Sequence, residues 1–230
     1  MHRITWHTPR QAEPIWSWLH SRMSRPGTVE SLVPSGFESY VSIPNSRDPE
    51  DDGCTLQQYR DDPIACPDGR NQLDRLLDVL DPATGRQPIH CAIWEGFGGM
   101  FGEADGTVRG AAVGFFFDDP AEDTPAARRT LEARWRESRP LRPAHTTLNL
   151  PARRFHTWTT TLDDLRADSE LLDGFSPSIV VPDDHSWLWH SEIDDRRTEI
   201  GGPAALLTPL LGDDWGGVVM TPPSAAPSDD

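Results

Sequence analysis

Apolar residues recur at i, i+3, i+4 and i+7 within residues 71–81, a spacing that predicts an amphipathic helix. The four positions are occupied by Leu73, Leu76, Leu77 and Leu80. We expect this helix to end at Pro82, because proline cannot continue the backbone hydrogen bonding. Weaker stripes of the same period predict helices over residues 12–23 and 125–138, the second capped by Thr124.

Other segments alternate apolar and polar residues with a period of two, which is typical of β-strands. In residues 153–162, Phe155, Thr157 and Thr159 share one face of the predicted strand. Strands are predicted over residues 37–43, 89–94, 111–117, 153–162, 185–195 and 217–220, with a further strand and a turn within 176–202.

Along the sequence, the predicted helices alternate with strands whose order favours antiparallel pairing between neighbours. This order predicts an α+β fold: a single domain with a mixed, largely antiparallel sheet and helices packed mainly on one face. We place that domain at residues 28–220, after an N-terminal arm of residues 1–27. Residues 221–230 are expected to form a disordered acidic tail.

The strand predicted over residues 185–195 carries more polar residues than a sheet needs. Alternation places one set inward as a core face, and this set is His185, Trp187, Trp189 and Ile193. The other set faces outward, and it is Leu188, His190, Glu192 and Asp194. The turn before the strand contains Asp183 and Asp184 after a proline, a turn signature that also makes both carboxylates candidate binding residues.

An imidazole in line with carboxylates allows two interpretations. His190 with Glu192 and Asp194 could ligate zinc, manganese or iron, with His156 as a third donor from a neighbouring strand. The simpler interpretation is a solvated sheet face that happens to carry a histidine, and it has the greater weight. We therefore expect no bound metal or other cofactor.

Trp94 and Glu95 begin a glycine-rich loop that superficially suggests a phosphate-binding motif. Phe101 occupies the third glycine position of G-x-G-x-x-G, and no helix pattern follows, so a hairpin loop is favoured. Glu95 is a candidate polar anchor, which could pair with Glu192 or Asp194 in acid–base chemistry.

Nucleophilic catalysis has no signature in the sequence. The chain contains no G-x-S-x-G, and alternation points His90 and Cys91 to opposite faces of their strand. Lysine chemistry is excluded because all 21 basic residues are arginines.

The net charge limits the kinds of partner that the protein can bind. The formal charge of −16 argues against binding nucleic acid or an anionic membrane. Three widely spaced cysteines fit reduced thiols, and the first residues lack the apolar core of a secretory signal, so we expect a cytoplasmic protein. No feature of the sequence indicates an oligomeric state.

Four segments together resemble a family of proteins from high-GC bacteria whose function is unknown. They are VPSGFESYVSI at 33–43, IWEGFG at 93–98, LPARRFHTWTTTL at 150–162 and SPSIVVPDDHSWLWHSEIDDRRTEIGG at 176–202. The chain departs from the family pattern at residues 179–181, where we would expect aromatic residues. The resemblance implies one compact domain and no particular activity.

Two hypotheses for function follow. The first is an acidic binding protein, immunity-like or inhibitory toward a basic protein partner, which fits the negative charge and the absence of catalytic motifs. Its contact surface would centre on tryptophans and carboxylates, since aromatic anchors dominate binding energy. Its expected contact residues are Trp94, Glu95, Asp183, Asp184, His185, Trp187, Trp189, His190, Glu192 and Asp194. The second is a small metal- or carboxylate-dependent enzyme acting on a polar ligand.

Overall fold

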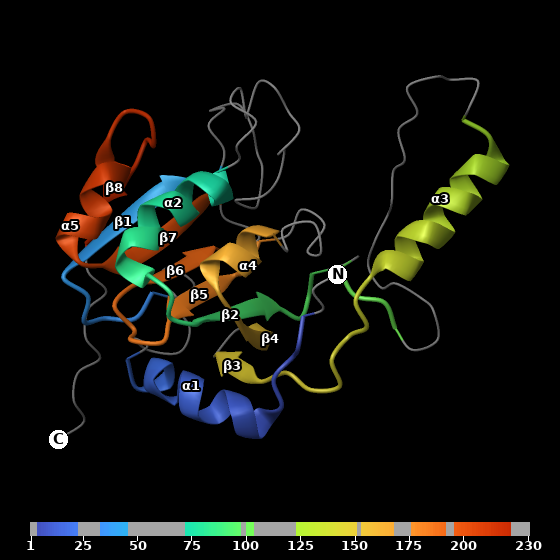
Figure 1. Ribbon diagram of the computed structural model, residues 1–230, viewed down its shortest axis with the longest axis horizontal. Helices are drawn as coiled ribbons and strands as arrows, with labels where there is room; N and C mark the ends of the chain where they lie inside the picture. The colour runs from blue at the N-terminus through green and yellow to red at the C-terminus, as the bar shows by residue number, and fades with distance from the viewer. Residues whose placement is uncertain are drawn as a thin grey trace. The chain divides into compact units, whose positions relative to one another are not determined.

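Eight strands pair in the order β3-β4-β2-β5-β6-β7-β1-β8 in a computed structural model (Figure 1). The structure describes residues 4–22, 33–45, 72–97, 100–103, 123–150, 153–167, 176–191 and 196–221. The strands are β1 (Ser39–Pro44), β2 (Ile89–Trp94), β3 (Leu148–Leu150), β4 (Arg153–Thr160), β5 (Ile179–Pro182), β6 (Leu188–Ser191), β7 (Arg197–Gly202) and β8 (Val218–Val219). Every ladder between these strands is antiparallel, as expected for an α+β fold with a largely antiparallel sheet.

The chain divides into two compact units, residues 1–95 with 145–230, and residues 96–144. The helices of the first unit are α1 (Pro9–Arg22), α2 (Gln72–Thr84), α4 (Leu162–Ala167) and α5 (Ala204–Leu207), followed by the 3-10 turn η2 (Thr208–Leu211). The helix α2 contacts both α4 and α5 on one face of the sheet, which confirms that helices cover mainly one face. The exception is α1, which lies across the opposite face (Figure 1).

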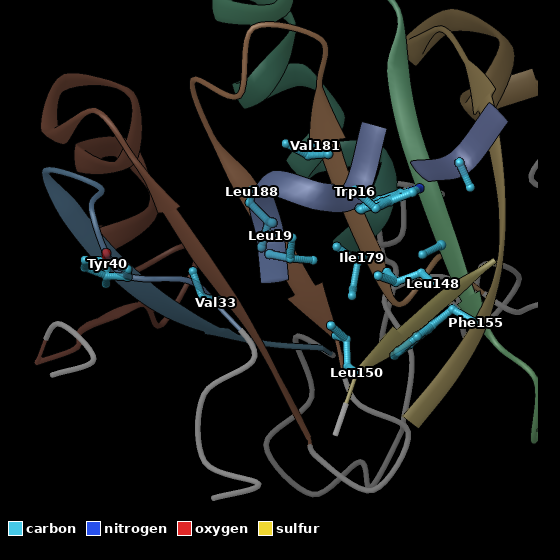
Figure 2. Packing of buried hydrophobic residues seen from close by; sticks show 12 residues of the cluster. Trp16, Leu19, Val33, Tyr40, Leu148, Leu150, Phe155, Ile179, Val181 and Leu188 are labelled. Carbon is cyan, nitrogen blue, oxygen red and sulfur yellow. The ribbon is translucent and has the colours of Figure 1, made fainter. Parts of the chain in front are cut away.

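The stripe predicted in residues 12–23 anchors α1 to the sheet. Ala12, Trp16 and Leu19 are buried in one cluster with strand residues that include Ile179 and Leu188. Figure 2 shows Trp16 and Leu19 packed beside these two strand residues. The helix begins earlier than expected, at Pro9. The reason is that the Thr8 carbonyl accepts hydrogen bonds from the backbone N–H groups of Gln11 and Ala12. The N-terminal segment thus contributes directly to the core of the first unit.

The opposite face is built around α2, whose predicted leucine stripe is buried. The helix continues two residues past Pro82 to Thr84, so the expected end point was wrong. The reason is visible at Thr84, whose hydroxyl donates to the Leu80 carbonyl and accepts from Trp187 Nε1 at 3.0 Å. This pair of hydrogen bonds holds the last turn against the sheet.

Register explains why β6 is buried on both sides. A row of Cys91, Val180, Trp189, Ile200 and Val41 crosses five strands and packs on the α2 face. The residues one position away along each strand, such as Ile179 and Leu188, point to the α1 face. Since both faces are covered by helices, neither set of alternating side chains on β6 reaches solvent.

The second unit contains α3 (Pro125–Ser138), with Thr124 as its cap and proline at its first position, as predicted. Arg142 pairs with Glu103 at 2.8 Å and lies over the Phe101 ring within this unit. The strand expected over residues 111–117 and the tail after Thr221 lie outside the described residues.

Candidate functional site

The turn between β5 and β6, residues 183–186, replaces the first part of the predicted 185–195 strand. His185 has φ of 55°, a left-handed conformation that ends strand pairing before Leu188. Asp184 Oδ1 accepts from the Ser186 backbone at 2.9 Å, and the Asp184 backbone donates to Gln87 Oε1 at 3.0 Å. The turn is therefore held by its own side chains and by the chain preceding β2.

Electrostatics at the turn favour a charged Asp184 carboxylate and a neutral His185 imidazole. Partial burial alone would raise the pKa of Asp184, but hydrogen bonds from Ser186 and Gln87 lower it below its ordinary value. The pKa of His185 is lowered, first by burial and then by nearby His90. The turn consequently presents negative charge, with the Asp183 side chain 66% exposed.

A continuous chain of side-chain hydrogen bonds starts at Asp183 and crosses the α1 face. His90 Nε2 lies 3.1 Å from Asp183 Oδ1, and His90 Nδ1 lies 2.9 Å from Thr159 Oγ1. His7 contacts Thr159 and Thr157 through its two ring nitrogens, at 2.9 and 3.1 Å. Thr147 closes the chain, 2.7 Å from Thr157. We call this set the relay, and its members are Thr147, Thr157, His7, Thr159, His90 and Asp183.

Strand register places the relay residues together. His90 lies directly opposite Thr159 across the β2–β4 ladder, and Asp183 follows the β5 residue that pairs with Ile89. His7 belongs to a short extended segment whose backbone donates to the Thr157 carbonyl at 2.8 Å. Four segments distant in the sequence therefore supply one network.

The direction of the hydrogen bonds follows from the carboxylate at the end. Asp183 can only accept, so His90 carries a proton on Nε2. In the tautomer in which this is the single ring proton, His90 Nδ1 accepts from the Thr159 hydroxyl. The Thr159 oxygen then accepts from His7 Nε2–H, and His7 Nδ1 accepts from Thr157. All donors consequently point the same way, toward the carboxylate.

The ring of His7 is neutral in this arrangement. Burial, and second the proximity of His90, lower the pKa of His7 to about 4. At neutral pH the His7 ring therefore has one donor and one acceptor nitrogen, which matches its two threonine partners.

Sequence analysis singled out Asp183 but missed its partner His90, and it missed Thr159 and His7, which are linked to Asp183 through His90. The shared face of Thr157 and Thr159 was visible from alternation. Which histidine lies opposite them depends on strand register, and no motif in the sequence encodes that register.

Trp94 and Glu95 do not join the turn. They lie at the other end of β2, five residues beyond Ile89, which is about 17 Å along an extended strand. The Arg153 guanidinium lies over the Trp94 ring at 4.5 Å, and Arg154 forms an ion pair with Glu95. The predicted single surface is thus split between two ends of the sheet.

Trp187 and Trp189 are fully buried on the α2 side, with ring centroids 6.1 Å apart. Their inward orientation is confirmed, and complete burial removes them from any docking surface. They support the sheet beneath the turn instead.

The expectation of an outward His190 was wrong. His190 is 5% exposed, because α1 covers the face on which it lies, and burial followed by the Arg153 charge lowers its pKa to about 3. His156 lies opposite Ile93, on the other face of the sheet, so it cannot act as the third ligand beside His190. Glu192 and Asp194 lie outside the described residues.

Within the described residues, no group of three histidine, cysteine or carboxylate side chains could hold a metal ion. In the same part of the chain, no helix has the length and apolar character needed to cross a membrane. No family model, curated protein or solved structure matches this chain. The resemblance to a bacterial family therefore stays a prediction.

Proposed function

We propose that this chain is an acidic binding protein that contacts a basic protein surface through the β5–β6 turn. The observation that carries the proposal is the fixed, exposed acid pair Asp183 and Asp184 beside a stacked aromatic pair, Trp18 and His185. Net charge of −16 supports the choice of a basic partner, since complementary charge accelerates encounter and suppresses acidic competitors.

The geometry of the turn favours binding because its side chains are already held in place before a partner arrives. The His185 ring stacks on Trp18 with centroids 4.2 Å apart, and Arg22 lies over the Trp18 ring at 5.8 Å. Side chains that are already fixed lose less conformational entropy on association than free ones. An arginine-bearing partner could contact the carboxylates in bidentate fashion while covering the aromatic pair.

The proposal includes an inhibitory or immunity-like role in the cytoplasm of the producing bacterium. A protein that neutralises a basic nuclease or toxin needs a negative surface and a rigid contact. Both features are those of the turn.

The test is capture of partners from a native lysate of the producing cells by immobilised protein, at low and at physiological salt. The diagnostic variant combines Asp183→Asn with Asp184→Asn. Asparagine retains the oxygen that accepts from His90 or Ser186, so the turn keeps its hydrogen bonds and loses two charges. The matched control combines Asp163→Asn with Asp213→Asn, which removes the same charge from exposed positions elsewhere.

We expect the wild type and the control to retain one stoichiometric basic protein that the diagnostic variant loses. For the purified pair, the affinity should fall at least about tenfold, corresponding to about 1.4 kcal/mol for two interfacial charges. Equal capture by the diagnostic variant would exclude the turn as the contact. Recovery of no stoichiometric protein at either salt concentration would overturn the binding function itself.

A further inference from the structure

Within the relay, a hydroxyl, an imidazole and a carboxylate are hydrogen-bonded one to the next. They belong to Thr159, His90 and Asp183. The two distances that join them are 2.9 and 3.1 Å. A hydroxyl within hydrogen-bonding reach of a base, which is itself oriented by a third group, is the structural signature of an activated nucleophile. The turn-binding role of Asp183 makes no use of Thr159.

The assigned hydrogen positions give each group the form that nucleophilic catalysis requires. In the tautomer of His90 with its single proton on Nε2, Nδ1 accepts the Thr159 proton and Nε2–H donates to Asp183. His7 donates to the Thr159 oxygen at 2.9 Å, and this bond occupies one of the two lone pairs of that oxygen. The second lone pair is not used by any of these bonds, and Thr159 is an exposed residue.

We propose that Thr159 is a nucleophile that accepts acyl groups from small activated esters. Its Oγ1 forms a bond to the acyl carbon, while its proton moves to His90 Nδ1 and the alkoxide leaving group departs with the electrons of the broken ester bond. The imidazolium that results is stabilised by Asp183. This chemistry makes the chain a carboxylate-dependent enzyme, a function separate from partner binding.

Hydrolysis of the acyl-threonine completes the cycle. His90 returns its proton to the leaving group or to solvent and then removes a proton from water. The oxygen of that water attacks the acyl carbon, and Thr159 recovers a proton as the carboxylic acid departs. The net reaction is ester plus water giving acid plus alcohol.

His7 has a positioning role in this scheme. Its Nε2–H is directed at the oxygen that becomes more negative as the hydroxyl proton leaves, which stabilises that charge. Its lowered pKa keeps Nδ1 free to accept from Thr157, so the ring cannot rotate without losing a hydrogen bond.

A structural role for the same residues would also place them together, since the relay ties the N-terminal segment to β4. The two roles differ in reactivity. A purely structural network has no reason to make Thr159 more reactive than any other threonine of the chain, such as Thr160 on the same strand.

The test uses p-nitrophenyl acetate with the full-length protein, following p-nitrophenolate release and locating the acetyl group by peptide mass. The absence of lysine removes the commonest competing acceptor. We expect rapid acetylation of Thr159 in the wild type, and its loss in Thr159→Val. Thr159→Ser should restore it, and His90→Asn should slow it by about 100-fold or more. The matched control is Thr160→Val, which removes a hydroxyl that faces the opposite side of the sheet.

Circular dichroism establishes that each variant is folded before it is compared. If Thr159→Val fails to fold, Asp183→Asn decides the question, because it keeps the hydrogen bond to His90 but removes the charge that stabilises imidazolium. Acetylation that is unaffected by His90→Asn and Asp183→Asn would overturn the proposal. Acetylation found only at other residues, or equally at Thr160, would do so as well.

Discussion

The ring of His185 lies flat against that of Trp18, with an interplanar angle of 24° and a centroid separation of 4.2 Å. This contact joins α1 to the β5–β6 turn, which the sequence separates by more than 160 residues. It also accounts for the backbone of His185. A left-handed conformation costs roughly 1 kcal/mol for a residue other than glycine or asparagine, and stacking offsets that cost.

The stacked pair should show a measurable coupling energy. In a double-mutant cycle of Trp18→Ala and His185→Asn, we expect a coupling of about 0.5–1.5 kcal/mol in the free energy of urea-induced unfolding. Asparagine accepts the left-handed backbone, so the second variant removes the ring without adding strain. Trp18→Phe serves as the control that retains an aromatic face. A coupling near zero would show that the two rings are adjacent without stabilising each other.

Gly217 allows close approach of the chain before β8 to the end of η2. A methyl group at this position would collide with the backbone carbonyl of Leu210, which belongs to a packed turn and cannot rotate away. We expect Gly217→Ala to cost about 1–3 kcal/mol of unfolding free energy, measured by urea titration. Gly212→Ala is the matched control, because its added carbon would lie at an ordinary 3.5 Å from the Pro209 carbonyl. Equal effects of the two substitutions would contradict this account.

Periodicity in the sequence was sufficient to predict much of the fold. The leucine stripe of α2, the Thr124 cap of α3 and the alternation of β4 each depend on neighbours along the chain, and each is confirmed. The same local rules predicted an inward side for Trp187 and Trp189, which is buried as expected.

The candidate site was less predictable, because it depends on which segments meet. The outward position expected for His190 assumed that one face of the sheet is open to water. The helix α1 closes that face, and a stripe of three apolar residues does not reveal where a helix docks. Likewise, His90 becomes a partner of Thr159 only through the register of β2 against β4.

Acid should weaken the fold through His190. Its folded pKa of about 3 lies below the ordinary value of 6.5, so between these values the unfolded chain binds a proton that the folded chain excludes. Stability is therefore fully present above pH 6.5 and falls as the pH is lowered toward 3, by about 1.4 kcal/mol per pH unit for one such group. His7, with a folded pKa of about 4, acts in the same direction.

Urea unfolding at a series of pH values measures this slope, and His190→Leu isolates the contribution of one ring. Nε2 of His190 is buried and has no hydrogen-bond partner among the described residues, so leucine removes an unsatisfied polar atom. We expect the variant to be at least as stable as the wild type at pH 7 and to lose less stability in acid. An unchanged slope would mean that His190 is protonated in the folded protein.

Cys91 should be unreactive until the protein unfolds. It is completely buried in the row that contains Val180 and Trp189, and burial raises the pKa of its thiol well above the ordinary value. Since the thiolate is the form that reacts with alkylating reagents, both the access and the fraction of reactive species are low in the folded state. Iodoacetamide treatment followed by peptide mass mapping should find Cys91 unmodified in buffer and fully modified in urea. Labelling of Cys91 in buffer at the rate of a free thiol would show that the sheet opens between β2 and β5 far more readily than its packing implies.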